Sequence, residues 1–293
     1  MNVMNRLVKS YKTGILHRIL SSFSGSLGLV LIFLIVFIAI FSPLLSPYSP
    51  TEIDVTNRLA APSFKHPFGT DHLGRDLLSR LLFGSRIALL VSIPAIAIGL
   101  GVGIILGTLA GYSGGMTDNS LVFLFDVVRA FPTLLFALTI IMLTGGANLL
   151  ILVLVLGFTR FPGYGRLVRA QSAQVSKREF VMASEAAGSS TPRILVKHIF
   201  PNAIGPVFIN AAMDIPVIIT FAAGLSFLGL GVPPPTPGWG RILRSGYSYI
   251  RTSPWMVVFG ASFLVLATLG FTFLGESLRD ALDPKLKKSP QLQ

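Results

Sequence analysis

Long runs of apolar residues, separated by shorter polar segments, occupy most of this chain. A bilayer core requires about 20 apolar residues per helix. We therefore predict an all-α membrane protein with six transmembrane helices, at residues 27–46, 87–111, 119–143, 148–167, 209–231 and 254–275. A transmembrane β-barrel would instead alternate apolar and polar residues, so the continuous runs argue against that class.

Two of these spans have an alternative interpretation. Residues 27–46 follow a basic segment and could be a signal peptide, but no small-residue cleavage site follows the apolar run, so we predict an uncleaved helix. In the span 148–167, only residues 149–158 are free of polar interruption before Arg160 and Pro162. This span is the weakest of the six, and its existence decides the orientation of everything that follows.

The distribution of Lys and Arg indicates which side each connection occupies. With six spans, the tail 1–26, the segment after the fourth span and the tail 276–293 lie on one side, and they hold most of the basic residues. By the positive-inside rule this side is the cytoplasm. We therefore expect both termini to be cytoplasmic and residues 47–85 to form an extracytoplasmic loop before the membrane core 86–275.

Composition supports the membrane class and excludes others. The chain is 52% hydrophobic and only 12% charged, far from the composition of a soluble domain. Its formal net charge of +12 could suggest a nucleic-acid partner, but the basic residues are scattered among the loops, where they orient the protein in a lipid membrane. The chain has no cysteine, which excludes disulfides and thiolate metal sites.

Histidine and aspartate residues cluster in the loop 47–85 but lack the spacing of a zinc site, so we expect a surface loop and no metal: His66, Asp71, His72 and Asp76. Trp239 and Trp255 are predicted to anchor the chain at the membrane interface.

Glycines recur at every fourth residue of the second span, where they form a stripe that allows close helix packing: Gly99, Gly103, Gly107 and Gly111. We favour packing within this subunit over a seam between subunits.

Charged residues inside the spans are candidates for function. Asp126 and Arg129 are three residues apart on one face of the third span, and we predict that they pair. Asp214 has no charged neighbour in the sequence, and it either lies at the inner interface or faces a polar pathway.

Residues 177–202 form a charged segment in this otherwise apolar chain. Lys177–Ala187 is predicted to be a helix that Gly188 ends, and a second helix is predicted to run from Arg193 to Phe200 and to end at Pro201. Two short helices joined at a glycine make a compact projection that a soluble partner could bind. The alternative is a solvated loop with no special role.

The spacing within this segment points to a family. Gly188 and Pro201 are thirteen residues apart, with Ala183 and Ser184 just upstream, and this pattern resembles the cytoplasmic coupling loop of ATP-binding-cassette (ABC) importer permeases. The leading Glu of that loop falls on Met182, and the Glu at Glu185 is offset by three residues. The resemblance implies that the ATPase contacts include Met182, Ala183, Ser184, Glu185, Gly188 and Pro201.

Three further segments resemble the second (C-type) permease subunit of dipeptide, oligopeptide and nickel transporters: HPFGTDHLGRDLLSR at 66–80, LSFLGLGVPPPTPGWG at 225–240 and GESLRDALDPK at 275–285. The resemblance implies a type I ABC importer permease fold in a bacterial or archaeal cytoplasmic membrane. It also implies four partners: a second permease subunit, two ATPase subunits and an extracytoplasmic substrate-binding protein.

The chain contains no G-x-x-x-x-G-K-[ST] phosphate loop. We therefore expect no catalytic site and no cofactor in this chain, with ATP and Mg bound by the ATPase subunits. The cargo stays open among dipeptides, oligopeptides, a nickel chelate and glutathione.

Two functions of other classes are weaker alternatives. A stand-alone proton-coupled transporter would need essential intramembrane carboxylates, and only Asp126 and Asp214 are available. A membrane hydrolase would use Ser113 in GYSGG, but the G-x-S-x-G motif requires a strand-to-helix turn.

Overall fold

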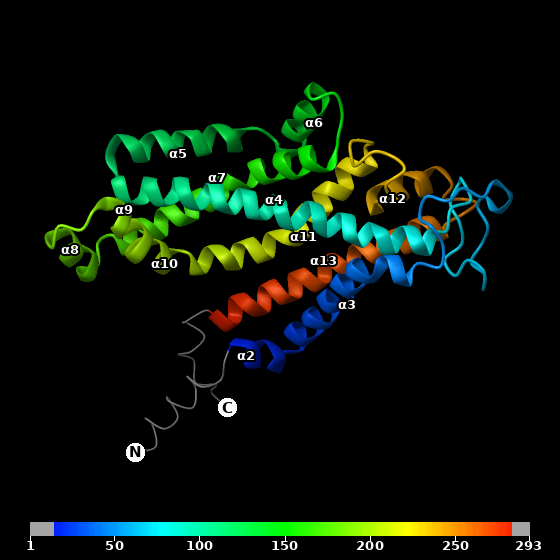
Figure 1. Ribbon diagram of the computed structural model, residues 1–293, viewed down its shortest axis with the longest axis horizontal. Coiled ribbons are helices and arrows are strands. Elements are labelled where there is room, and N and C mark those ends of the chain that lie inside the picture. Colours follow the sequence, from blue (N-terminus) through cyan, green and yellow to red (C-terminus); the bar gives the residue numbers. More distant parts are fainter. Residues whose placement is uncertain (1–14, 283–293) are drawn as a thin grey trace, which may run out of the picture.

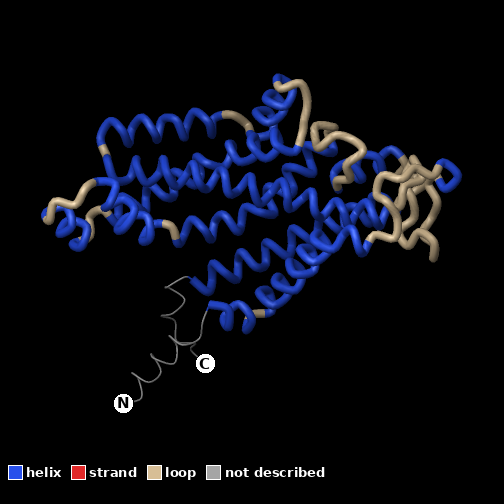
Figure 2. The backbone as a smooth tube through the Cα atoms, viewed as in Figure 1, coloured by secondary structure: helices blue, strands red, loops and turns tan. Residues whose placement is uncertain are grey.

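The computed structural model describes residues 15–282, and this part of the chain consists of helices and loops with no β-strand (Figures 1 and 2). Five helices are long and apolar enough to cross a membrane: α3 (Phe23–Leu45), α4 (Leu77–Ser113), α7 (Leu149–Val175), α11 (Gly205–Phe227) and α13 (Trp255–Leu282). A sixth candidate crossing is the helix pair α5 (Gly115–Ala130) and α6 (Thr133–Leu143), which is long and apolar enough only when taken together and is bent by 84° at a break.

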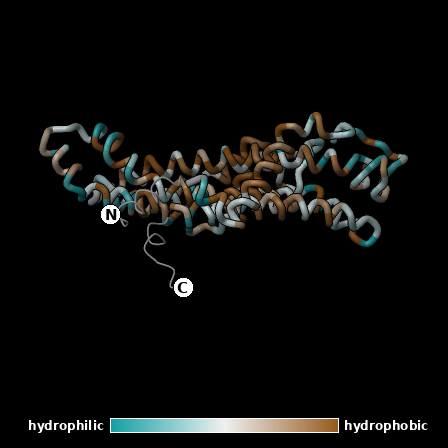
Figure 3. Tube along the Cα trace, turned by 90° about the horizontal axis from the view of Figure 1, so that it is seen from below, coloured by the Kyte–Doolittle hydropathy of each residue, from teal (hydrophilic) through white to brown (hydrophobic). Residues whose placement is uncertain are grey.

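Consecutive crossings run in opposite directions, as the colours of Figure 1 show. The described chain therefore begins and ends on the same side, the side that also carries the segment after α7. Apolar residues fill the middle of the molecule and hydrophilic residues gather at its two ends (Figure 3). This arrangement has the parity predicted for six spans. Most of the tails, residues 1–14 and 283–293, lies outside the described residues.

Several boundaries differ from those predicted. The fourth span, which had the weakest hydropathy, is the most embedded crossing, with 56% of its apolar window buried inside the protein. Because more than half of this window packs against other parts of the protein, it needs fewer apolar residues than a span surrounded by lipid. The predicted tails also contain helical residues, because α2 (Ile15–Ser21) precedes α3 and α13 continues to Leu282. Arg18 Nη1 donates a hydrogen bond to the Ala281 carbonyl oxygen at 3.2 Å, which joins α2 to the end of α13.

The third predicted span, 119–143, is broken rather than continuous. The break falls at Phe131 and Pro132, between α5 and α6. Proline disfavours helical backbone in the residue before it and has no N–H to donate to the preceding turn. Phe131 accordingly has extended backbone (φ −81°, ψ 129°). Irregular backbone at membrane depth is tolerated where it lines a protein cavity.

Helices α4 and α7 form the most extensively packed helix pair. The glycine stripe of α4 faces α7 along the whole contact, so the stripe packs within this subunit. A Cβ added at Gly99 would lie 2.6 Å from the Gly157 carbonyl oxygen, and one at Gly103 would lie 2.6 Å from the Tyr164 Cβ. Gly107 and Gly111 meet α7 at Gly165 and Arg169 in the same way. Only glycine permits this approach of the two backbones.

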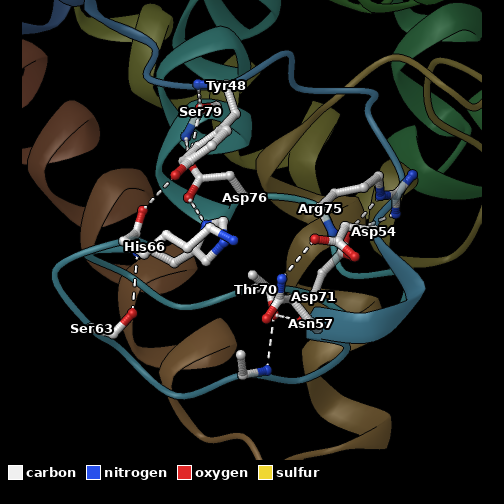
Figure 4. Close-up of polar contacts among 12 residues, drawn as sticks. Tyr48, Asp54, Asn57, Ser63, His66, Thr70, Asp71, Arg75, Asp76 and Ser79 are labelled. Carbon is white, nitrogen blue, oxygen red and sulfur yellow. Dashed lines mark hydrogen bonds and ion pairs between the residues drawn. The ribbon is translucent and has the colours of Figure 1, made fainter.

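The loop between α3 and α4 is a structured unit with buried polar side chains, so the expected surface loop is wrong for most of its His and Asp residues (Figure 4). Asp76 caps α4, because its Oδ2 accepts the Ser79 backbone N–H at 2.8 Å, and its Oδ1 lies 2.9 Å from His66 Nδ1. Asp71 pairs with Arg75 at 2.8 Å and with Arg80 at 3.4 Å. The described residues contain no group of three or more potential metal ligands.

The two tryptophans predicted as membrane anchors both donate hydrogen bonds within the protein. Trp239, the first residue of α12 (Trp239–Ser248), is buried, and its indole N–H donates to the Leu81 carbonyl oxygen at 3.0 Å. Trp255 donates to the Thr70 carbonyl oxygen at 3.3 Å. Both side chains therefore tie the outer loops to the helix bundle.

Candidate functional site

A polar cavity of about 500 Å³ lies where the α5–α6 break meets α7 and α11. It combines charged, hydroxyl and aromatic side chains. Its lining consists of Val128, Arg129, Phe131, Thr133, Phe136, Thr159, Arg160, Gly163, Tyr164, Leu167, Asn210 and Asp214.

Helical spacing explains how these residues meet. Arg160 and Tyr164 are four residues apart on α7, so they lie one above the other on one face, and Asn210 and Asp214 do the same on α11. The sequence pattern treats Arg160 only as an interruption of an apolar run. The signal that could have identified it is this repeated polar spacing inside a span.

An ion pair crosses the cavity from α7 to α11. Arg160 Nη1 lies 3.7 Å from Asp214 Oδ1, and the side chains are 21% and 27% exposed. The Arg160 guanidinium also lies 5.5 Å from the centre of the Phe221 ring, a favourable cation–π geometry. Asp214 therefore faces the polar cavity, one of the two locations expected for it.

Tyr164 contributes a buried hydroxyl beside this pair. The hydroxyl lies near the Asp214 carboxylate, but no hydrogen bond of normal geometry joins it to a partner among the described residues. The Arg160 Nε is likewise buried without a hydrogen-bond acceptor. Buried polar groups are usually satisfied by protein, water or a ligand. Both atoms are enclosed by the surrounding protein, so neither faces the open space of the cavity.

The predicted pair between Asp126 and Arg129 does not form. Asp126 instead makes an ion pair with Arg166 of α7. Residues three apart on a helix can pair, but the close packing of α5 against α7 offers Asp126 a partner across the helices. Arg129 is exposed in the cavity and has no ion pair or hydrogen bond within residues 15–282.

The glycine stripe positions the cavity residues of α7. Besides its contact with Gly157, a Cβ on Gly99 would lie 3.1 Å from the Arg160 Cβ, and a Cβ on Gly103 would press on Tyr164. The close approach of α4 therefore fixes the positions of the Arg160 and Tyr164 Cβ atoms, from which both side chains extend toward the cavity. Packing and site geometry are linked here.

A second candidate site lies at the end of the bundle, after α7. It consists of α8 (Glu179–Ala186), α9 (Thr191–Ile194), a π-helical turn at Leu195–Ile199 and α10 (Phe200–Ala203). Gly188 lies between α8 and α9 with φ +76°, a conformation that favours glycine. The second helix does not end at Pro201 as predicted, because Pro201 is in the first turn of α10, where its missing N–H costs no hydrogen bond.

A small apolar core holds this projection together, formed by Val175, Val181, Ile194 and Ile199. The Tyr112 hydroxyl, near the end of α4, donates to Glu185 Oε1 at 2.9 Å, so Glu185 contacts the subunit's own helix. Ala183, Gly188 and Pro201 are exposed and Ser184 is half-buried. Met182 is also exposed, as are three further apolar side chains of this projection: Phe180, Val196 and Phe200.

With both sites located, comparison with known proteins identifies the family. Residues 103–288 match the family described as binding-protein-dependent transport system inner membrane component, and residues 15–62 match the N-terminal TM domain of oligopeptide transport permease C. This chain belongs to the binding-protein-dependent inner membrane permeases. The resemblance noted in the sequence is thereby confirmed.

Curated relatives of this permease share most of their length with it. It is 40% identical over 260 residues to the dipeptide transport system permease protein DppC of Alkalihalophilus pseudofirmus, covering 89% of this chain and 85% of that protein. It is 38% identical over 261 residues to the oligopeptide transport system permease protein OppC of Bacillus subtilis, with the same coverages of 89% and 85%.

The solved structures show the fold. A structure titled as an inward-facing conformation of the MetNI methionine ABC transporter superposes with a TM-score of 0.57 at 18% identity, covering 71% of this permease and 98% of that chain. This match confirms the type I importer permease fold predicted for the chain. With the family match, the permease is a multi-pass inner membrane component of a binding-protein-dependent transport system.

Proposed function

We propose that this permease forms half of the translocation pathway for dipeptides or oligopeptides. The observation that carries the proposal is the polar cavity at the α5–α6 break, because it is a space lined by charged side chains within an apolar bundle. Intramembrane charges that face a cavity mark solute pathways. The names of the relatives support peptides over a nickel chelate or glutathione.

The proposed complex contains this chain, a second permease subunit, two ATPase subunits and an extracytoplasmic substrate-binding protein, in the cytoplasmic membrane of a bacterium or archaeon. ATP and Mg bind to the ATPase subunits, and this chain is not itself an enzyme. ATP binding can only bias an equilibrium between conformations of the helix bundle. The projection α8–α10 is the mechanical link, and its exposed apolar side chains are available for contact with an ATPase subunit: Phe180, Met182, Val196 and Phe200.

The stand-alone proton-coupled alternative is disfavoured by the ion pairs. It requires a carboxylate that can take up and release a proton inside the membrane. Asp214 is paired with Arg160 and Asp126 with Arg166, so neither carboxylate stands alone as such a carrier would require.

The experiment is uptake of a labelled dipeptide by the complete complex, reconstituted in vesicles with its binding protein. We expect uptake to require ATP on the side of the ATPase subunits. Uptake that persists without the ATPase subunits, driven by a proton gradient, would overturn the proposal in favour of the alternative.

A matched pair of variants tests the mechanical link. Gly188→Ala places a side chain at φ +76°, which costs about 1–2 kcal/mol, whereas Gly205→Ala adds the same methyl group in open space without a positive φ. We expect Gly188→Ala to lower the peptide imported per ATP hydrolysed and Gly205→Ala to leave it unchanged. The bulkier Gly188→Trp should uncouple the two processes, and normal coupling in that variant would show that α8–α10 is not the link.

A further inference from the structure

The cavity carries unequal charge. Two guanidinium groups, those of Arg129 and Arg160, line it, and among the described lining residues Asp214 supplies the carboxylate. Arg160 is engaged with Asp214 at 3.7 Å and with the face of the Phe221 ring. With that pair counted as neutral, the remaining charge is the cation of Arg129. A cation in a space walled by apolar helices attracts an anion more strongly than it would in bulk water.

Arg129 is placed to bind such an anion. It lies in the last turn of α5, two residues before the break at Phe131, and its side chain is exposed to the cavity. The neighbouring carboxylate of Asp126 does not neutralise it, because Asp126 is paired with Arg166. A guanidinium presents a planar fork of N–H donors that matches the two oxygens of a carboxylate.

The rest of the cavity fits the body of a small organic solute. Thr133, the first residue of α6, borders the same space, and the N-terminal turn of a helix carries partial positive charge. Val128, Phe136 and Leu167 add apolar walls. The volume of about 500 Å³ is in the range of small-molecule sites, about 300–1,000 Å³. Apolar walls can accept different side chains, but only a charged group can pair with Arg129.

We propose that Arg129 binds the free carboxylate of the solute as it passes through this cavity, so that the permease itself favours solutes that carry a carboxylate. Arg160 and Asp214 act as a fixed ion pair that keeps the opposite wall neutral. This inference rests on the proposed function of the cavity as part of the peptide pathway.

The first test compares a dipeptide with its C-terminal amide in the complete reconstituted complex. The ratio of acid uptake to amide uptake is measured for the wild type, Arg129→Gln and Arg129→Lys. The ratio between complexes cancels any preference of the binding protein, which is the same in all three. We expect Arg129→Gln to lower the acid-to-amide ratio by about tenfold or more, the factor for one charge-assisted hydrogen bond, and Arg129→Lys to keep most of it. An unchanged ratio in Arg129→Gln would overturn the proposal.

The second test uses the absence of cysteine in this chain. Arg129→Cys creates a thiol that can be converted to a short ammonium side chain with 2-aminoethyl methanethiosulfonate, or to an anionic or neutral one with related reagents. We expect dipeptide uptake to fall in Arg129→Cys and to recover only with the ammonium reagent. Recovery with every reagent, or with none, would mean that Arg129 fills space or holds structure, and would refute carboxylate binding.

Two controls separate this inference from the function on which it rests. Val127→Cys lies on the same helix but does not line the cavity, and its modification should leave uptake unaffected. If the wild-type complex imports no peptide with ATP, the proposed function fails. If it imports peptides and the Arg129 variants behave as wild type, the carboxylate site alone fails. Should Arg129 pair instead with an acidic residue of the second permease subunit, Arg129→Lys would keep uptake while Arg129→Gln lowered acid and amide uptake equally.

Discussion

Replacing Gly103 with alanine tests the seam between α4 and α7. In the structure an added Cβ would lie 2.6 Å from the Tyr164 Cβ, 2.8 Å from the Phe161 carbonyl oxygen and 2.9 Å from the Gly165 nitrogen. Carbon atoms in contact are normally about 3.5–4.0 Å apart. The helices must therefore separate by about 1 Å, and since two of the three atoms are backbone, no side-chain rotation relieves the clash.

The magnitude follows from two opposing terms. Overpacking of a tight contact costs about 1–3 kcal/mol, whereas replacing glycine with alanine inside a helix gains about 1 kcal/mol. The matched control is Gly101→Ala on the same helix, where nothing lies within 4 Å of the added Cβ. This control has the helix gain without the clash, so the difference between the two variants isolates the overpacking term. We expect Gly103→Ala to be less stable than Gly101→Ala by about 1–3 kcal/mol.

The assay is thermal unfolding of the purified complex, followed by the loss of this subunit from the monodisperse fraction at increasing temperature. We expect the order Gly101→Ala at or above wild type, and Gly103→Ala below it. Gly103→Ala should also lower peptide uptake, because the displaced neighbour Tyr164 lines the cavity. Equal stability of the two alanine variants would refute the close approach of α4 and α7.

Two further predictions concern the charged residues. A double-mutant cycle of unfolding free energies between Asp126→Asn and Arg166→Gln should show a coupling energy of a few tenths to about 1 kcal/mol, as expected for a partly exposed ion pair. The cycle between Asp126→Asn and Arg129→Gln should show no coupling. The opposite result would restore the pairing predicted from the sequence. Asp76→Ala removes the N-cap of α4 and should destabilise the outer loop by about 1–2 kcal/mol, which would be measured as faster proteolysis of that loop. Asp76→Asn keeps an oxygen that can accept the Ser79 N–H, so this variant should lose less stability.

The number and direction of the membrane crossings could be predicted because apolar length and the distribution of Lys and Arg act through the bilayer alone. The glycine stripe was also visible, since a repeat of four residues places one bare face on any helix. The turn at Gly188 follows from local chemistry, because few residues other than glycine adopt a positive φ. These features depend on short stretches of chain.

The partners of the charged residues depend on which helices become neighbours, and the sequence does not contain that information in any local form. Asp126 binds Arg166 because α5 packs against α7, and Asp214 meets Arg160 because α11 crosses α7 at that depth. The buried polar cluster of the outer loop could not be predicted for the same reason. His66 and Asp76 are ten residues apart and meet only because the loop folds back on the start of α4.

The break at Phe131–Pro132 has a local signal in the sequence, but its consequence depends on how the helices pack. A proline inside an apolar run is a clear local signal for a kink, but the prediction from apolar length treated residues 119–143 as one continuous helix. The cavity exists because of this break, so the span that departs most from a regular helix is also the one that carries the proposed function.

The most direct test of the account asks whether the solute passes through the cavity. Asn210→Cys places a thiol in its lining on α11, and Val265→Cys places one on an exposed face of α13 that does not line it. We predict that a bulky thiol reagent stops ATP-driven dipeptide uptake only in the Asn210→Cys complex, and that dipeptide slows the modification. Full uptake after complete modification of Asn210→Cys would contradict the account.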